Sequence, residues 1–411
     1  MSGLDGAGLG RPRLKWPRLS EMRPFNRRLL LALLVAGAIV VQLTLVIRLL
    51  VAIGQGYLPH DFLAYDGAAR NLLAGRPLYD LTATETGGLG LFLYPPSFAL
   101  LMLPVVVVPS NVAAPIWMVL LTVVGILAVW RMPVSRPIRW VMTLMLGLSW
   151  PFIDALAQGQ VGPILLLLFV AGWRAVDRPA PVAPGAVPES RRLPRERPTL
   201  LGVAIGLGAT IKIQPAVVIA WAALTRRFRA AAIAIGVVAI LAAVATLIVG
   251  VQAWSDLASV LAATNRPEFT MNSVGVARLA YEAGASSALA TQIYLASLVA
   301  AAVAVVVAIR RCTPVSSYLV AAVASQLFSP VIWPHYGVVL LLPVAWLLGR
   351  GRWWAILLLV PISIPIADSI PSVVYPIVFW LAILATILVG RRPASSAASA
   401  SSPASLSSAQ A

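Results

Sequence analysis

Long apolar stretches alternate with short polar connections along most of the chain, from residue 29 to residue 390. About 20 apolar residues in a helix are enough to cross the hydrocarbon core of a bilayer. Within that core, only helices and closed barrels satisfy the hydrogen bonds of their own backbones. The pattern predicts an all-α polytopic membrane protein with about twelve membrane-spanning helices, at residues 29–53, 110–130, 139–157, 161–175, 199–211, 214–225, 230–250, 287–309, 315–330, 335–349, 353–367 and 371–390.

One apolar piece does not fit this scheme. Residues 97–108 are too short for an ordinary crossing, and prolines punctuate them and their flanks. We predict that this piece is re-entrant or lies at the membrane interface. The longest polar connections are residues 54–96, 174–198 and 251–286.

The two ends of the chain differ in composition. Residues 1–28 form a basic segment, and the apolar run after it is longer than the roughly 7–15 apolar residues of a signal peptide. We therefore interpret residues 29–53 as an uncleaved first span. Residues 391–411 form a low-complexity Ala/Ser tail, which is expected to be disordered.

Composition and charge narrow the choice of partners. The chain is 60% hydrophobic and 11% charged, whereas soluble domains carry about a quarter charged residues. A net charge of +17 raises the question of a nucleic-acid partner, but the basic residues stand in short clusters between apolar runs. Because no basic domain with interleaved aromatic residues is present, we expect a lipid bilayer and no nucleic acid as the partner.

The basic clusters also predict the orientation. Cytoplasmic loops are enriched in Lys and Arg. With the N-terminus inside, 25 of the 31 Lys and Arg residues fall on the cytoplasmic side, and residues 174–198 form an Arg/Pro-rich cytoplasmic loop. We expect a multi-pass cell (plasma) membrane protein with both termini in the cytoplasm. Residues 54–96 and 251–286 are then outer loops.

Unusual polar residues gather on the outer side in this orientation. They lie in outer loops or at outer helix ends: His60, Asp61, Tyr94, Gln158, Gln160, Lys212, Gln214, Asn272, Arg278 and His335. A polar cavity on one side is typical of an enzyme that acts on lipid-borne substrates, whereas a secondary transporter places its site near the midplane. Transport stays open as the alternative, and a non-catalytic scaffold is a third reading.

The first of these polar clusters is HDFLAYDGAARNLLAGRPLYD, residues 60–80. Asp66 and Arg70 are four residues apart on a predicted helix, which favours a surface ion pair. Asp61 has no such neighbour. It can cap this helix, or act as a general base beside His60, and the two roles are compatible.

Each of the remaining signals for a functional residue is weak on its own. Lysine at a membrane interface, as at Lys212, usually extends to the lipid head groups, although an ionisable residue at that depth is a functional candidate. Trp and Tyr near His335 are ordinary interface residues. The single cysteine, Cys312, allows no intramolecular disulfide. No metal-ligand spacing stands out, so we expect no metal and no cofactor.

Taken in order, six motifs resemble the GT-C glycosyltransferases of family 87 (GT87): HDFLAYDGAARNLLAGRPLYD, YPPSFALLMLP, QGQVGPILLLL, IKIQPAVVIAWAAL, NSVGVAR and SPVIWPHYG. The resemblance implies a GT-C type bundle over residues 29–390, with short amphipathic helices in the extracytoplasmic first loop. It implies an α-mannosyltransferase that moves a hexose, mannose in particular, from a polyprenyl-phosphate sugar donor to a glycolipid or glycan acceptor outside the cell. The alternative is a transporter or flippase for a lipid-linked sugar.

The resemblance also assigns roles to residues. Asp61 is the expected general base of an inverting transfer, and Lys212 and His335 occupy positions suited to the donor phosphate. The expected substrate-binding residues are His60, Tyr65, Tyr94, Gln160, Lys212, Gln214, Asn272, Arg278 and His335. One carboxylate suffices for such a transfer, whereas glycosidases use two. The sequence shows no comparable pair of carboxylates.

Overall fold

The computed structural model describes residues 24–82, 90–177, 197–270, 272–364 and 371–392. The described part is helical and contains no strand, only two isolated β-bridges. The all-α class is therefore confirmed for these residues. Most of the basic segment 1–28, of the loop 174–198 and of the tail 391–411 lies outside the described residues.

In the described residues, the elements follow one another from α1 to α16, with four 3₁₀ helices (η) among them. They are α1 (Pro24–Gly54), α2 (His60–Leu73), α3 (Pro96–Leu101), η2 (Leu103–Val107), α4 (Ser110–Arg131), α5 (Arg136–Leu148), α6 (Trp150–Gln158), α7 (Gly162–Val176), α8 (Pro198–Ile211), α9 (Ala216–Leu224), α10 (Phe228–Val249), α11 (Gln252–Thr264), α12 (Val276–Glu282), α13 (Ser287–Arg311), α14 (Pro314–Leu327), η3 (Pro334–Leu340), α15 (Leu341–Leu348), η4 (Trp353–Leu358), η5 (Val360–Ile362) and α16 (Val374–Gly390).

Four described helices are long and apolar enough to cross a membrane: residues 35–54 of α1, and all of α4, α10 and α13. Six further apolar segments of the described chain, among them α7, α8 and α14, are shorter. The expected count of about twelve spanning helices is thus not confirmed and stays a prediction. Neither α3 nor η2 is long enough to cross, which agrees with the interpretation of residues 97–108.

The expected span at residues 139–157 is two helices, α5 and α6. Pro151 has no amide hydrogen to bond a carbonyl of the preceding turn, so the helix cannot continue regularly through it. A new helix begins instead at Trp150, and Ser149 caps it by accepting a hydrogen bond from the amide of Phe152. Helix α6 carries Asp154 and Gln158, two residues of the cavity wall described below.

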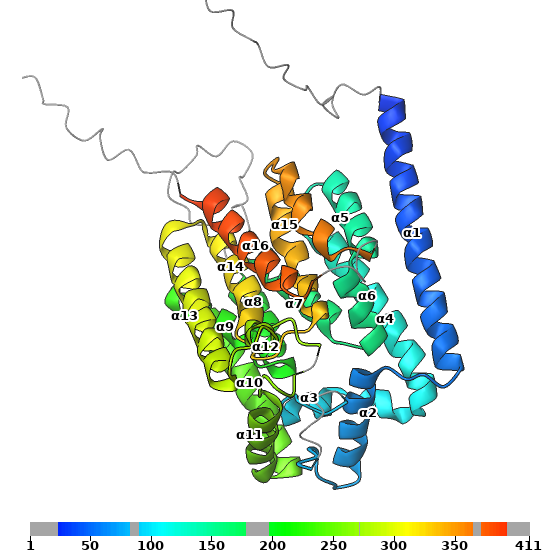
Figure 1. Ribbon diagram of the computed structural model, residues 1–411, viewed down its shortest axis with the longest axis vertical. Helices are drawn as coiled ribbons and strands as arrows, with labels where there is room; N and C mark the ends of the chain where they lie inside the picture. The colour runs from blue at the N-terminus through cyan, green and yellow to red at the C-terminus, as the bar shows by residue number, and fades with distance from the viewer. Residues whose placement is uncertain (1–23, 83–89, 178–196, 271, 365–370, 393–411) are drawn as a thin grey trace, which may run out of the picture.

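Figure 1 shows how the two ends of the bundle differ. The start of α1 and the end of α16 lie at one end, and α2, α3 and α11 gather at the other. Helix α14 is buried along its length, from Val315 to Leu327, so it lies in the interior of the bundle. The segments predicted to be outer loops therefore meet at the end of the bundle where α1 finishes.

Candidate active site

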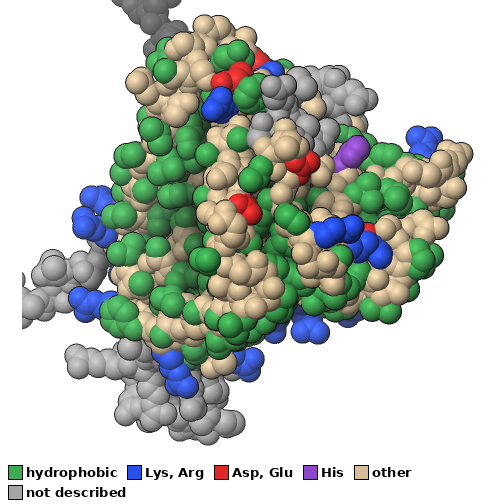
Figure 2. All heavy atoms as spheres, turned by 90° about the horizontal axis from the view of Figure 1, so that it is seen from below, with side chains coloured by type: hydrophobic (Ala, Val, Ile, Leu, Met, Phe, Trp, Pro, Cys, Tyr) green, Lys and Arg blue, Asp and Glu red, His purple; other side chains and the backbone are tan. Residues whose placement is uncertain are grey.

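A cavity of about 660 Å³ lies among residues from α2, α6, α9 and α11, with η3 and the segments before it and after α8. Figure 2 views the molecule from the end that carries α2 and α11, where charged side chains are few and scattered. The polar and charged residues of the wall are Asp61, Tyr94, Asp154, Gln158, Gln160, Lys212, Gln214, Asn265, Asn272, Ser329, Trp333, His335 and Tyr336. Six of the sequence-predicted binding residues, and Asp61, thus share one cavity.

Asp61 lies in the first turn of α2, but it does not cap the helix. The N-cap is Pro59, and no side chain caps this end. The Asp61 carboxylate instead accepts a hydrogen bond of 2.5 Å from Nε2 of Gln160. The capping interpretation is therefore wrong, and the side chain takes part in the cavity wall.

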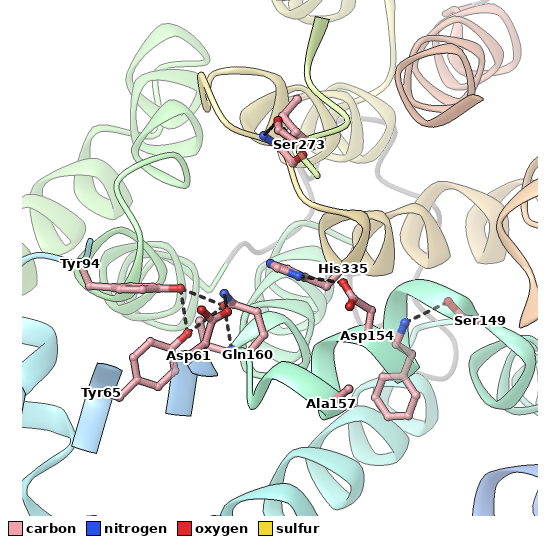
Figure 3. A network of polar contacts seen from close by, with 12 residues as sticks. Asp61, Tyr65, Tyr94, Ser149, Asp154, Ala157, Gln160, Ser273 and His335 are labelled. Atoms are coloured by element: carbon pink, nitrogen blue, oxygen red, sulfur yellow. Dashed lines mark hydrogen bonds and ion pairs between the residues drawn. The ribbon is translucent and has the colours of Figure 1, made fainter. Parts of the chain in front are cut away.

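The orientation of the Gln160 amide follows from two buried tyrosines (Figure 3). The hydroxyls of Tyr65 and Tyr94 lie 2.8 Å apart, and each lies 3.0 Å from Oε1 of Gln160. The amide of Val161 also donates to Oε1. Because these groups can all donate to an oxygen, Oε1 faces them and Nε2 is left to donate to Asp61. Tyr65 therefore supports the site from behind the wall.

A glycine brings Gln160 to Asp61. Gly159 ends α6 in the left-handed conformation, with φ of +70°, which glycine adopts without steric cost. A Cβ at this position would lie 2.7 Å from Cβ of Phe62 on α2. The missing side chain therefore allows both the turn after α6 and the close approach of α2.

The charge state of Asp61 depends on this environment. Burial raises the pKa of its carboxyl above the ordinary value, and the negative charge of Asp154 adds to this. His335, Lys212 and the hydrogen bond from Gln160 lower the pKa and oppose the shift. Burial also raises the pKa of Tyr65 and of Tyr94 well above 10, so both stay neutral hydroxyls.

Lys212 follows the last residue of α8 in an extended conformation, and the residue is only 7% exposed. Its Nζ lies 4.2 Å from the ring centroid of Tyr336 and 5.5 Å from that of Tyr94. In the described part of the chain, no carboxylate is within ion-pair distance of Nζ. The ammonium group is thus held by aromatic rings at the cavity wall, and Gln214 donates to the Tyr336 hydroxyl beside it.

His335 and Asp154 form a contact that the sequence did not suggest. Nδ1 of His335 lies 3.1 Å from Oδ2 of Asp154, 181 residues away along the chain. Asp154 lies in an apolar stretch between Trp140 and Ala157 in which no other side chain is ionisable. An ionisable residue in such a stretch is a functional candidate, and this signal was available but not used. The cavity thus holds two carboxylates where the sequence suggested one.

Besides Tyr65, two predicted binding residues do not line the cavity, His60 and Arg278. His60 is exposed, and its ring meets Tyr57 edge-on at 6.2 Å between centroids. Arg278 pairs with Glu282 at 2.8 Å and donates to the carbonyls of Pro267 and Glu268. The guanidinium of Arg278 therefore stabilises the loop between α11 and α12.

The ion pair predicted between Asp66 and Arg70 is present at 2.9 Å. It is not at the surface, however, because the Asp66 side chain is only 4% exposed. The hydroxyl of Ser110 also donates to this carboxylate, at 2.6 Å. Asp66 therefore links α2 to the start of α4 and is not one of the residues that line the cavity.

Chemically, the cavity combines a hydrogen-bonded carboxylate with an ammonium group and an imidazole. Such a set can accept a proton at Asp61 and stabilise negative charge near Lys212. Within the described ranges, no three His, Cys, Asp or Glu side chains are grouped as metal ligands would be.

Comparison with known proteins identifies the family. The chain matches the family model "Glycosyltransferase family 87" over residues 92–334. It is 27% identical, over 339 residues, to the polyprenol-phosphate-mannose-dependent alpha-(1-2)-phosphatidylinositol mannoside mannosyltransferase of Mycobacterium tuberculosis, with 72% of each chain covered. No solved structure matches it significantly. Since the family match spans more than half of the chain, this protein belongs to glycosyltransferase family 87.

Proposed function

We propose that the protein transfers mannose from a polyprenyl-phosphate mannose donor to a lipid-linked glycan acceptor, with inversion at the sugar carbon. One observation carries this proposal: a single cavity presents the Asp61 carboxylate together with Lys212 and His335. The first group suits an acceptor hydroxyl and the other two suit a phosphate. The mycobacterial relative is named for a polyprenol-phosphate-mannose donor and a phosphatidylinositol mannoside acceptor, which supports the same substrate classes.

The reaction balances without any further reactant. The acceptor oxygen attacks the anomeric carbon of mannose, and its proton passes to the Asp61 carboxylate. The bond between that carbon and the phosphate oxygen breaks, and its electron pair stays on the phosphate. A base on one face of the sugar and a leaving group on the other give inversion.

Negative charge grows on the phosphate as this bond breaks. Fixed cations and hydrogen-bond donors aimed at the growing charge lower the barrier, because they need no reorganisation during the reaction. Lys212 supplies such a cation, held against the rings of Tyr336 and Tyr94. His335 supplies a second donor on the same wall.

In this proposal, residues 29–390 form the GT-C type catalytic domain in the cell membrane. The loops 54–96 and 251–286 face outward and cover the cavity, and residues 1–28, 174–198 and 391–411 are cytoplasmic. Lipid-borne substrates then reach the cavity from the outer leaflet.

The decisive test is a transfer assay on the purified full chain in lipid nanodiscs. With radiolabelled polyprenyl-phosphate mannose and phosphatidylinositol mannosides, we expect a labelled glycolipid product. A flippase would move labelled donor across sealed vesicles and form no new glycosidic bond, and that outcome contradicts the proposal. Loss of one mannosylated species from the lipid-linked glycans of a deletion strain would identify the natural acceptor.

The orientation can be tested by labelling single cysteines. Cys312 is buried and can be replaced by serine. Ala283, between α12 and α13, and Arg352, between α15 and η4, are both exposed. We expect a membrane-impermeant thiol reagent to label Ala283→Cys in intact cells and Arg352→Cys only after permeabilisation. The reverse pattern would contradict an outward-facing site.

The pH dependence of transfer should report on Asp61. The general base must be ionised, so kcat is expected to fall as the pH drops through the pKa of Asp61. Because burial raises this pKa, the fall should begin at a higher pH than for an ordinary aspartate. Gln160→Leu removes a hydrogen bond that lowers this pKa. It should therefore move the acid limb of the pH profile, where kcat falls as the pH drops, to still higher pH.

Gln252→Leu is the matched control, because Gln252 is exposed on α11 and, within the described chain, its side chain bonds Asp256 and no residue of the cavity. Its acid limb should coincide with that of the parent. An unchanged limb in folded Gln160→Leu protein would argue against Asp61 as the titrating base.

A further inference from the structure

Asp154 has no role in the reaction as described so far. Its carboxylate lines the same cavity as Asp61, and its side chain is 15% exposed. Among the described residues, its carboxylate has one hydrogen-bond or ion-pair contact, with Nδ1 of His335 at 3.1 Å. An acidic residue so placed needs an explanation, because burying a charge is costly unless the charge is paired.

The packing of α6 against η3 sets this contact. Pro151 and Asp154 lie three residues apart, so they share one face of α6. Gly337 of η3 meets that face, and a Cβ on it would lie 2.8 Å from Cγ of Pro151. The absence of a side chain at position 337 therefore lets η3 approach closely enough for His335 to reach Asp154.

The other ring nitrogen of His335, Nε2, is free to bind a ligand. The residue is 4% exposed, and its Nε2 has no hydrogen-bond partner among the described residues. In Figure 3 this nitrogen points away from Asp154, toward the side where Asp61 and Gln160 lie. A buried polar atom without a partner costs about 1–3 kcal/mol, and such atoms occur at sites where a ligand completes the bonding.

We propose that Asp154 is a positioning residue for sugar transfer: by accepting the hydrogen bond from Nδ1 of His335, it holds Nε2 toward the phosphate of the donor. This inference rests on the proposed function, because it takes the donor phosphate to lie at Lys212 and His335. Asp154 itself touches no substrate.

The charge of the imidazole decides what Nε2 can do. With both nitrogens protonated, the ring donates hydrogen bonds from Nδ1 to Asp154 and from Nε2 to a phosphate oxygen, and no proton is transferred. If only Nδ1 were protonated, Nε2 would present a lone pair to the phosphate and repel it. The Asp154 carboxylate supplies the countercharge that the protonated ring needs.

Few other charged or titratable groups surround the pair in the described chain. Asp61 on α2 and Lys212 after α8 line the same cavity, and Tyr336 adjoins His335 with its ring centroid 5.1 Å from the imidazole. Tyr375 of α16 and Tyr57, which precedes α2, are close enough to Asp154 to feel its charge. Of the carboxylates in the described residues, Asp154 alone contacts the imidazole directly.

A double-mutant cycle tests the inference. Asp154→Asn keeps the shape of the side chain and removes its charge, and His335→Gln removes the imidazole. Each change should lower kcat for transfer from polyprenyl-phosphate mannose about 10–100-fold, with the KM for the acceptor unchanged. Because Asp154 acts only through His335, the double variant should be no slower than His335→Gln alone.

Two controls complete the design. Asp256→Asn removes a carboxylate on α11 that lies outside the cavity, and it should keep parental kinetics. Gly337→Ala forces η3 away from α6 and misplaces His335 without changing a polar group. We expect it to lower kcat and to be non-additive with Asp154→Asn. Thermal unfolding of each purified variant shows that it is folded.

Two outcomes would overturn the inference. The first is that the fold-losses of kcat in Asp154→Asn and His335→Gln multiply in the double variant. Asp154 would then act independently of His335, as a second general base would. The second is a parental kcat in Asp154→Asn, which would mean that the contact between Asp154 and His335 does not contribute to transfer. Binding of polyprenyl phosphate can be measured for the parent, the two single variants Asp154→Asn and His335→Gln, and the double variant. This measurement repeats the cycle without catalysis. An inactive parent that still shows this coupling would reject the proposed function and not the positioning role.

Discussion

Replacing Asp61 by asparagine should lower the rate of sugar transfer by about 10²–10⁴-fold, the usual contribution of a well-placed general base. Asparagine has the shape of aspartate, and its carbonyl oxygen can still accept the hydrogen bond from Gln160 that the carboxylate accepts at 2.5 Å. The fold of α2 should therefore survive, while the group proposed to take the acceptor proton is lost. Initial rates of mannose transfer by purified Asp61→Asn protein check this expectation.

Asp66→Asn is the matched control, five residues further along α2. Its carboxylate pairs with Arg70 and Ser110, away from the cavity. We expect a loss of stability of about 1 kcal/mol, because Arg70 is partly exposed and its interaction is weakened by solvent. The kcat of the folded protein should hardly change. Equal losses of kcat in the two variants would instead assign Asp61 a structural role in its loop.

The helical class followed from hydrophobicity because the apolar runs in this chain are long. The ends of the helices did not follow equally well. The break between α5 and α6 depends on Pro151 and on the Ser149 cap, a local signal within an otherwise apolar run. The run at 353–367 contains the short 3₁₀ helices η4 and η5. Hydropathy averages over a window, so it does not resolve such interruptions.

The candidate site was predicted in part because its residues stand out as polar in apolar surroundings. Asp61, Lys212 and His335 were found in this way, and the structure brings them to one cavity. Which side chains pair with one another was beyond the sequence. Asp154 reaches His335 across 181 residues, and Arg278, which was expected to bind substrate, bonds its own loop. Only the packing of helices decides such pairings.

The donor phosphate gives the last prediction. Lys212→Met keeps the length and the apolar stem of the side chain and removes the charge. If the ammonium group stabilises the departing phosphate, kcat/KM for polyprenyl-phosphate mannose should fall about 10²–10³-fold, the range seen when one group that stabilises a transition-state anion is removed. The KM for the acceptor should stay near the parental value. Steady-state kinetics with each substrate varied in turn separate the two effects.

The competing explanation is that Lys212 extends to lipid head groups, as interfacial lysines usually do. Its 7% exposure and its contact with the Tyr336 ring argue against this. Arg266→Ala supplies the control, because Arg266 is an exposed cation at the same end of the bundle and outside the cavity. A lysine that touches only lipid would leave Lys212→Met as active as Arg266→Ala toward purified donor. If Lys212 binds the donor phosphate, Lys212→Met should lower kcat/KM for the donor and Arg266→Ala should not. Of these two cations, only Lys212 lines the cavity.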